Sequence, residues 1–531
     1  MFKNYPQKHS GVELEQETIG KIQEEKIPNL KQLKYLPKFL TNEEKRKIKI
    51  SFFFFFFSLI LLLILFYFFH LEIIPAVGGE YAEGIVGPSG PEAVLTRLVY
   101  SGLLKYESNL NLKPDLASNF KIDKDKKSIQ FCLRDAFWHH NKKVTIDDVI
   151  FTFNSAKEKK LENFIDLNVI KKITPNCLRV SSERSFEDRL SIFTLSIKPK
   201  DGTKLIGTGP FKIVRRPKSD SDKQVGEEES YLLKRNEKYY GEKPFIENIT
   251  LKIYPDLKSA FEALTKREID ALGFTPPQET FKPQAALNFY SFPLPSFTAI
   301  FFNLKKESPL KSREIRQALS YLTPKDKILK EALAEEGKII NGSSYNFEEA
   351  KKILSTIEGK EKSLSEISLT IIEDPLSSKV ADILLEEWRN FKIKIKLITI
   401  KPSEVKDVVS KRNFEAILLT ILTKLEADPY PLWHSSQIES GLNISGFSNR
   451  RADELLEKYK LTTDEKKEKE YADEFQQIIL KEIPAIFLYS INYNYLINKK
   501  IKGVSIEKIN YPEDRFNEIE KWYIKTKRSK K

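Results

Sequence analysis

One segment near the start of the chain is apolar throughout, whereas apolar and polar residues alternate in the remainder. Residues 52–69 read FFFFFFSLILLLILFYFF and carry no charge. A helix needs about 20 consecutive apolar residues to cross the hydrocarbon core of a bilayer, and there it satisfies its own backbone hydrogen bonds. The sequence therefore predicts one transmembrane helix over residues 51–74. No comparable run follows it, so the pattern is typical of a single-pass chain.

The charges that flank this segment indicate its orientation. Residues 45–49 read KRKIK, and only His70 and Glu72 follow the apolar run closely. Because basic flanks stay on the cytoplasmic side, residues 1–50 are predicted to form a flexible cytoplasmic tail, with the chain on the other side of the membrane, periplasmic or extracellular, from about residue 78. Residues 76–78 also resemble a signal-peptide cleavage site, so removal of the segment stays an alternative. The long leading tail and long apolar run favour an uncleaved anchor.

The rest of the chain reads as a mixed α/β protein. Short runs with period-two alternation indicate strands, and stretches with helical spacing of apolar positions lie between them. Strands that alternate with helices favour open, wound sheets over a sandwich. Strands are predicted over residues 129–133, 231–234, 249–253, 369–372, 393–397 and 416–420. Helices are predicted over residues 256–264, 312–319, 347–354, 377–388 and 451–459.

Composition and charge exclude several classes of protein. The 531 residues allow three to four domain-sized units, and 40% hydrophobic with 11% aromatic residues argues against wholesale disorder. Of the net charge of +13, four units lie in residues 1–50 and six in residues 521–531, which leaves +3 for the body. A nucleic-acid binder needs a basic stripe on a folded face, so no nucleic-acid partner is predicted.

The sequence contains few candidates for catalytic or metal-binding residues. Cys132 and Cys177 form either one bridge or none, and their spacing does not suit a zinc site. The sequence has five histidines and contains no nucleophile elbow, phosphate loop or zinc-protease motif in a suitable setting. The sequence therefore predicts no enzyme, no catalytic residue, no cofactor and no metal site.

A dozen short blocks occur between about residues 80 and 505 in an order typical of one family. In these blocks the chain resembles the bacterial extracellular solute-binding protein family 5, the oligopeptide- and dipeptide-binding receptors of ABC importers. The blocks include residues 98–104 (LVYSGLL), 114–117 (PDLA), 131–134 (FCLR), 144–149 (VTIDDV), 207–212 (GTGPFK), 235–241 (RNEKYYG), 268–270 (EID), 315–319 (IRQAL), 427–429 (ADP) and 443–449.

The resemblance implies a two-lobed, periplasmic-binding-protein-like α/β fold of type II with an extra subdomain, behind the N-terminal transmembrane helix. It implies ligand-driven hinge closure, crossovers between the lobes near residues 292–295 and 485–489, and a monomeric ectodomain. The implied divisions are lobe I over residues 80–98, 186–290 and 488–531, a satellite subdomain over 99–185, and lobe II over 291–487.

The resemblance also implies a function. The chain would be a membrane-tethered, extracytoplasmic substrate-binding protein that captures peptides in a cleft between the lobes and delivers them to an ABC permease. Two alternatives stay open: a ligand sensor or scaffold with the same fold, and a receptor for a non-peptide solute such as a metal chelate or an oligosaccharide, because fold does not decide the ligand. An extracellular hydrolase lacks a recognisable nucleophile and base.

A peptide whose amino terminus is buried needs a carboxylate partner, because an unpaired buried charge is costly. Asp428 and Glu426 are the candidates. Asp428 has an alternative interpretation as a turn residue before Pro429, and Glu426 has one as ordinary surface charge.

Aromatic residues are candidates to line pockets for peptide side chains. Trp433 and Tyr430 follow the candidate acids directly, and Phe301 is a further candidate. For Phe301, as for Trp138, packing in the core is the favoured interpretation, because large aromatic side chains mostly fill cores.

Overall fold

The computed structural model describes residues 40–530 except 70, 88–89, 159–166, 184, 187–188, 204, 218–228, 276–284, 342–344, 359–365, 392, 424–427, 440 and 463. Most of the predicted cytoplasmic tail, residues 1–39, therefore lies outside the described residues. The chain divides into two compact units. The first consists of residues up to 74 together with 526–531, and the second is the body, residues 75–525.

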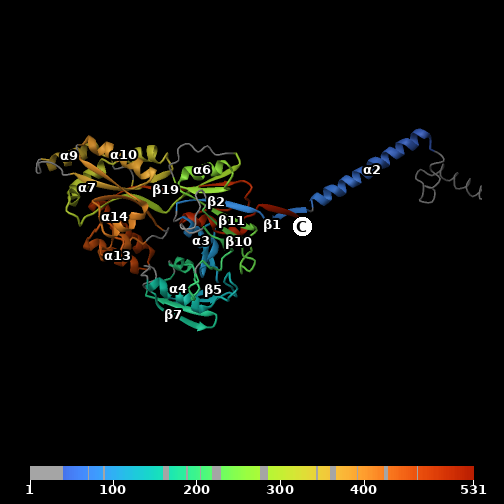
Figure 1. The fold of residues 1–531 in the computed structure, drawn as a ribbon, viewed down its shortest axis with the longest axis horizontal. Coiled ribbons are helices and arrows are strands. Elements are labelled where there is room, and N and C mark those ends of the chain that lie inside the picture. Colours follow the sequence, from blue (N-terminus) through green and yellow to red (C-terminus); the bar gives the residue numbers. More distant parts are fainter. Residues whose placement is uncertain are drawn as a thin grey trace, which may run out of the picture. The chain divides into compact units, whose positions relative to one another are not determined.

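The first unit contains helix α2 (Asn42–Phe69) and strands β1 (Leu71–Ala76) and β20 (Lys525–Lys530), which pair with each other (Figure 1). Thr41 and Glu44 cap the start of α2, since the Glu44 carboxylate accepts a hydrogen bond from the Thr41 backbone N–H at 2.8 Å. The helix is long and apolar enough to cross a membrane.

The helix does not extend as far as the predicted limit of residue 74. Residues 71–74 belong to β1 instead. Ile73 and Ile74 are β-branched and favour a strand, Pro75 cannot continue a helix, and β20 supplies the pairing partner. The apolar composition of residues 71–74 is compatible with a helix and with a strand. Composition alone therefore could not show where the helix ends.

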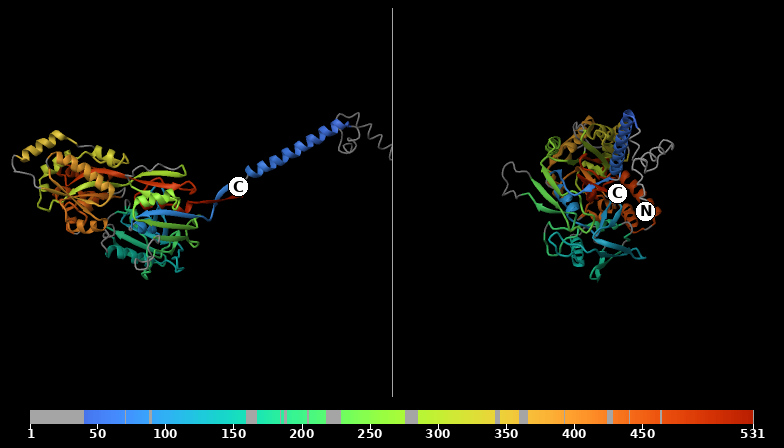
Figure 2. Two further views of the ribbon diagram at one scale, coloured as in Figure 1. Left: turned by 45° about the horizontal axis from the view of Figure 1, so that its top comes forward. Right: turned by 90° about the vertical axis from the view of Figure 1, so that its right-hand side faces the viewer.

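A mixed sheet of 12 strands runs through the described part of the body. Its main path has the order β17-β16-β18-β14-β19-β12-β2-β11-β10-β9, and two further strands pair with β19 (Figures 1 and 2). The strands are β2 (Glu80–Val86), β9 (Phe211–Arg215), β10 (Ser230–Arg235), β11 (Asn248–Tyr254), β12 (Ala271–Phe274), β13 (Leu287–Pro293), β14 (Ser296–Phe302), β15 (Gly337–Ile339), β16 (Ile367–Ile372), β17 (Ile395–Ile400), β18 (Ala416–Leu422) and β19 (Ala485–Asn498). The strands predicted in this region are confirmed, except that β17 begins at Ile395, two residues after the predicted start of that strand.

Strand β19 joins two halves of this sheet. Its first residues, 485–489, pair with β14, whereas residues 492–498 pair with β13. We call strands β17, β16, β18, β14 and β19 the β14 half of the sheet. Strands β12, β2, β11, β10 and β9 form the β2 half. The chain also passes between the halves in two residues, from Pro293 at the end of β13 to Ser296 at the start of β14. The change of partner in β19 falls at residues 491–492, a few residues later than the predicted crossover.

Helices cover both faces of the β14 half. In β14, Ile300 and Phe302 belong to the apolar core shared with α7 and α10, whereas Ala299 and Phe301 belong to the core beneath α13 and α14. Alternate residues of a strand point to opposite faces, which produces this division. The helices of the body are α3 (Gly90–Val99), α4 (Ile146–Glu158), α6 (Leu257–Thr265), α7 (Arg313–Tyr321), α8 (Lys325–Lys327), α9 (Phe347–Glu358), α10 (Pro375–Asn390), α11 (Val405–Ser410), α12 (Tyr430–Trp433), α13 (Arg450–Leu461) and α14 (Glu465–Glu482).

A smaller sheet with a separate core lies within residues 103–197. Its strands have the order β5-β6-β8-β7, and α4 packs with them around a cluster that includes Phe131, Phe153 and Phe193. Trp138 belongs to this cluster and is buried, as the core interpretation predicted. The strands of this region are β3 (Leu104–Tyr106), β4 (Leu112–Pro114), β5 (Ala117–Ile122), β6 (Ser128–Leu133), β7 (Leu167–Thr174) and β8 (Cys177–Ser182).

Cys132 and Cys177 form a disulfide, which answers the question that the sequence left open. Cys132 of β6 is directly opposite Cys177 of β8 in the antiparallel register, with their Cα atoms 4.1 Å apart. The bridge thus ties two neighbouring strands of the smaller sheet across 45 residues of chain.

The C-terminal part of the body is held by a buried polar cluster. Arg515, in the 3₁₀ helix η9 (Pro512–Phe516), donates two hydrogen bonds to one carboxylate oxygen of Glu83 in β2, at 3.0 and 2.8 Å. The other oxygen of Glu83 accepts hydrogen bonds from the phenols of Tyr81 and Tyr495. Burial, followed by the charge of Glu83, raises the pKa of both phenols, which therefore remain protonated donors.

Candidate functional site

A largely apolar cavity of about 330 Å³ lies inside the β14 half, among β14, β19, α12 and α14. Ligand pockets of proteins typically have volumes of about 300–1,000 Å³ and apolar walls with a few polar groups. This cavity fits that description, since aromatic and aliphatic side chains dominate its wall. The lining residues are Ser296, Phe297, Ile340, Asn341, Trp433, Phe475, Gln476, Ile479, Leu480 and Phe487.

Trp433 forms part of the wall and is held firmly in place. It ends the short helix α12 and is 5% exposed, with its ring centroid 6.1 Å from that of Phe301 and 6.0 Å from that of Phe487. Asn443 fixes the following loop, because its side-chain amide donates to the carbonyl oxygens of Trp433 and Phe447 at 3.3 and 2.8 Å. The indole is thus positioned before any ligand arrives.

A second cavity of about 170 Å³ has several wall residues in common with the first. Asn341, Leu480 and Phe487 line both. Lys325 lines the second cavity, and its ammonium donates to the carbonyl oxygen of Ile340 at 3.1 Å. Burial lowers the pKa of Lys325. The second cavity has a more polar wall than the first, since Gln317, Ser320 and Lys325 are among its lining residues.

The structure brings four of the predicted site residues together, in different roles. Trp433 lines the cavity, whereas Phe301 is 1% exposed and belongs to the core behind it. The Tyr430 ring stacks on His434 with centroids 4.1 Å apart, and the Lys460 ammonium lies 4.3 Å from its centre. Tyr430 is thus near Trp433 in the chain but is not among the residues that line the cavity.

Of the two candidate carboxylates, the structure describes only Asp428. Asp428 accepts a hydrogen bond from the backbone N–H of Tyr430 at 2.9 Å, the geometry of a turn that opens α12. The turn interpretation of Asp428 therefore has direct structural support, and its role toward a ligand amine stays a prediction. Glu426 lies outside the described residues.

Most wall residues were absent from the sequence prediction. Phe297 lies in β14 and Phe487 in β19, so only the folded sheet brings them to Trp433. One signal was present in α14, where Phe475 and Ile479 are spaced by four residues and share a face of the helix. Leu480 is next to that face and stays 39% exposed beside the cavity.

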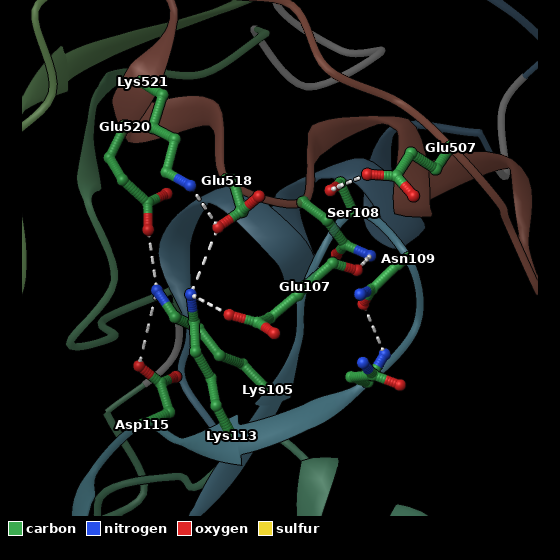
Figure 3. A network of polar contacts seen from close by, with 12 residues as sticks. Lys105, Glu107, Ser108, Asn109, Lys113, Asp115, Glu507, Glu518, Glu520 and Lys521 are labelled. Carbon is green, nitrogen blue, oxygen red and sulfur yellow. Dashed lines mark hydrogen bonds and ion pairs between the residues drawn. The ribbon is translucent and has the colours of Figure 1, made fainter.

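A charged network beside strands β3 and β4 was considered as a second candidate site (Figure 3). Lys105 lies between Glu520 at 2.7 Å and Asp115 at 4.0 Å, and Lys113 contacts Glu518 at 3.2 Å. Burial opposes the charge of Lys105, but Glu520 and Asp115 outweigh it and raise its pKa. The cavity beside the network is about 60 Å³, room for a few waters. Because these acids and lysines pair with one another, we interpret the network as a link between strands β3 and β4 and the C-terminal segment.

The comparisons with known proteins agree with this architecture. The oligopeptide-binding protein AppA of Bacillus subtilis is 23% identical over 527 residues, covering 85% of this chain and 92% of its own. The solved structure of that AppA in complex with a nonapeptide has a TM-score of 0.71, with 85% of this chain and 99% of that chain covered at 21% identity.

NikZ from Campylobacter jejuni, solved in complex with Ni(L-His), is similar to the same extent: its TM-score is 0.71 at 23% identity, covering 84% of this chain and 99% of that one. At such identities the structures establish the two-lobed α/β fold of periplasmic binding proteins, as predicted. The model of the middle region of the bacterial extracellular solute-binding proteins, family 5, matches residues 111–440. The chain belongs to this family of substrate-binding transport proteins.

Proposed function

We propose that this protein is a membrane-tethered, extracytoplasmic substrate-binding protein of an ABC importer, and that its ligands are peptides held between the two lobes. Membership of the solute-binding family supports the transport role. The AppA relative solved with a nonapeptide supports the peptide class. The NikZ relative solved with Ni(L-His) keeps a metal chelate as the second candidate ligand.

The cavity beside Trp433 is the observation that carries the peptide proposal. Its wall combines Trp433, Phe297 and Phe487 with aliphatic side chains from α14. Against such a wall, an apolar ligand side chain binds most favourably, because its burial contributes about 25 cal/mol of free energy per Å² of apolar surface. In this proposal, peptide backbone lies in the cleft between the lobes and one apolar side chain enters the cavity.

Two features support an extracytoplasmic body. Helix α2 has the length and apolar composition of a membrane span. The body contains a disulfide between Cys132 and Cys177, and disulfides persist in oxidising compartments outside the cytoplasm. We propose accordingly that the chain crosses the membrane once, with lobe I at residues 80–98, 186–290 and 488–531, the satellite at 99–185 and lobe II at 291–487.

Native mass spectrometry of the detergent-solubilised full chain tests this function. Purified protein would be measured intact and then denatured, and the released molecules identified. A heterogeneous set of short peptides supports the proposal. One defined metal chelate or sugar would retain the family and overturn the peptide assignment. An empty protein that gains no thermal stability with peptides would favour a sensor or scaffold role.

Filling the cavity is expected to weaken binding of peptides that carry large apolar side chains. Leu480→Trp would place an indole in the opening while changing only a partly exposed helix position. Because a fully buried large apolar side chain contributes about 1.5–3 kcal/mol, we expect a loss of about 10- to 100-fold in affinity by calorimetric titration. Leu461→Trp, at a 74% exposed position outside the cavity, is the matched control.

Comparing the affinities of peptides with and without the large apolar residue tests this prediction. Peptides in which alanine replaces the large apolar residue should bind Leu480→Trp and the unmodified protein equally. Equal weakening of both kinds of peptide, or none, would mean that the cavity does not accept a ligand side chain.

Neutralising Asp428 tests the proposed contact with a ligand amine. Asp428→Asn retains an oxygen that can accept from the Tyr430 N–H and removes the charge. Hydrogen bonds to charged groups contribute about 1.5–3 kcal/mol, so we expect at least about tenfold weaker binding of peptides with a free amino terminus. N-acetylated peptides should bind both proteins alike. Unchanged binding of free-amine peptides would leave Asp428 with only its role in the turn.

A further inference from the structure

The C-terminal strand of the chain is paired with the segment that leaves the membrane helix. Strand β1 begins at Leu71, two residues after the end of α2, and its partner in the two-stranded sheet is β20. We call this sheet the stem. Residues separated by more than 440 positions in sequence therefore meet beside the end of α2.

The direction of β20 follows from contacts at the base of the stem. Gly79 lies against the side chain of Ile524, and Gly78 lies against that of Lys525. Residue numbers therefore rise from 524 to 525 where they fall from 79 to 78. The two segments run in opposite directions, so β20 runs back along β1 toward the end of α2. Within β20, the later residues are consequently the closer to α2.

The stem is strongly basic. Strand β20 reads KTKRSK, whereas β1 contributes the single acid Glu72. Lys525, Lys527 and Arg528 are exposed. Alternate residues of a strand point to opposite faces, so Lys525 and Lys527 occupy one face and Arg528 the other. Both faces of the stem therefore present cations, and six of the thirteen net positive charges of the chain lie in residues 521–531.

We propose that the stem is a second membrane contact, in which the cations of β20 bind anionic phospholipid headgroups on the outer surface. This inference rests on the proposed single-pass topology. The 18 uncharged residues 52–69 form about 27 Å of helix, close to the thickness of the hydrocarbon core. The stem therefore begins at the outer headgroup layer, where attraction of basic residues to anionic lipid acts over about 10 Å.

Such a contact has a consequence for the receptor. A single helix alone would give the chain one attachment to the membrane. Two strands that emerge together and bind headgroups would add a second attachment at the membrane surface. The basic strand β20 is in this view a membrane contact.

Hydrogen exchange of the full chain in nanodiscs tests the proposal. The amides of residues 523–531 would be followed by mass spectrometry in phosphatidylcholine alone and in phosphatidylcholine with 30% phosphatidylglycerol, where the percentage is a chosen composition. We expect exchange at least about tenfold slower in the anionic discs, from roughly fivefold per bound cation. The difference should vanish in 0.5 M salt, a chosen concentration, and in K525Q/K527Q/K530Q.

Each other outcome overturns the proposal. Equal exchange in both lipids would exclude headgroup recognition. Faster exchange of the variant in both lipids alike would mean that the lysines only stabilise the strand pair. Slowing that appears only after an added permease would assign the stem to a protein partner. K466Q/K467Q/K469Q, on exposed positions of α14, is the matched control. The intact mass shows whether residues 1–70 are retained, so failure of the topology is distinguished from failure of the lipid contact.

Discussion

Replacing Arg515 by methionine is expected to lower the free energy of unfolding by about 3–5 kcal/mol, the cost of leaving a buried charge without its partner. Arg515 is 3% exposed and Glu83 is fully buried. The change removes both hydrogen bonds to Glu83, and the two phenols that remain cannot neutralise the carboxylate. Arg515 also lies over the ring of Phe516, 4.4 Å from its centre, so packing is lost as well. Denaturant unfolding of the full chain in detergent measures the effect.

A double variant and a surface control separate charge from packing. Glu83→Leu combined with Arg515→Met removes both charges and should recover much of the loss, because apolar replacements of a buried ion pair are often close to neutral. Arg451 makes an equally two-pronged contact with Glu474, at 2.7 and 2.8 Å, but both side chains are 47% exposed. Arg451→Met should cost at most about 1 kcal/mol. Similar losses for Arg515→Met and Arg451→Met would refute the burial argument.

The sequence was a good guide to elements whose pattern is local. The predicted strand at residues 416–420 lies within β18, and the predicted helix at 377–388 lies within α10. In α10, Asp374 caps the first turn through the Ser377 N–H, and Pro375 occupies the first helical position. Apolar spacing and caps are properties of neighbouring residues, so they are visible without the fold.

Features that depend on distant pairing could not be predicted in the same way. Residues 71–74 are apolar enough to continue α2, and only the pairing with β20, from the other end of the chain, makes them a strand. The change of partner along β19 likewise depends on where β13 and β14 lie in space. Sequence patterns contain no record of such partners.

The residues of the candidate site also divide into those that the sequence could identify and those that only the fold brings together. Trp433 was found because it follows an acidic turn that resembles a family block, and it does line a cavity. Phe301 lies on the same face of β14 as the wall residue Phe297, but it is buried in the core behind Trp433, against which its ring packs. The wall residues from β19 and α14 join Trp433 only through folding, so composition gave no reason to select them.

Removing the disulfide is expected to lower the free energy of unfolding by about 4 kcal/mol, the loop entropy released when a crosslink across 45 residues is lost. Cys132→Ser/Cys177→Ser leaves both strands of the smaller sheet in place, so the effect should fall on the core around Phe131 and Phe193. Denaturant unfolding of the full chain in detergent, with and without a thiol reductant, measures it. The reductant should destabilise the unmodified protein by the same amount and leave the double variant unchanged. Because the bridge joins residues already opposite each other in register, the reduced chain should still fold and bind ligand. A reductant effect of similar size on the double variant, or none on the unmodified protein, would show that this bridge does not stabilise the body.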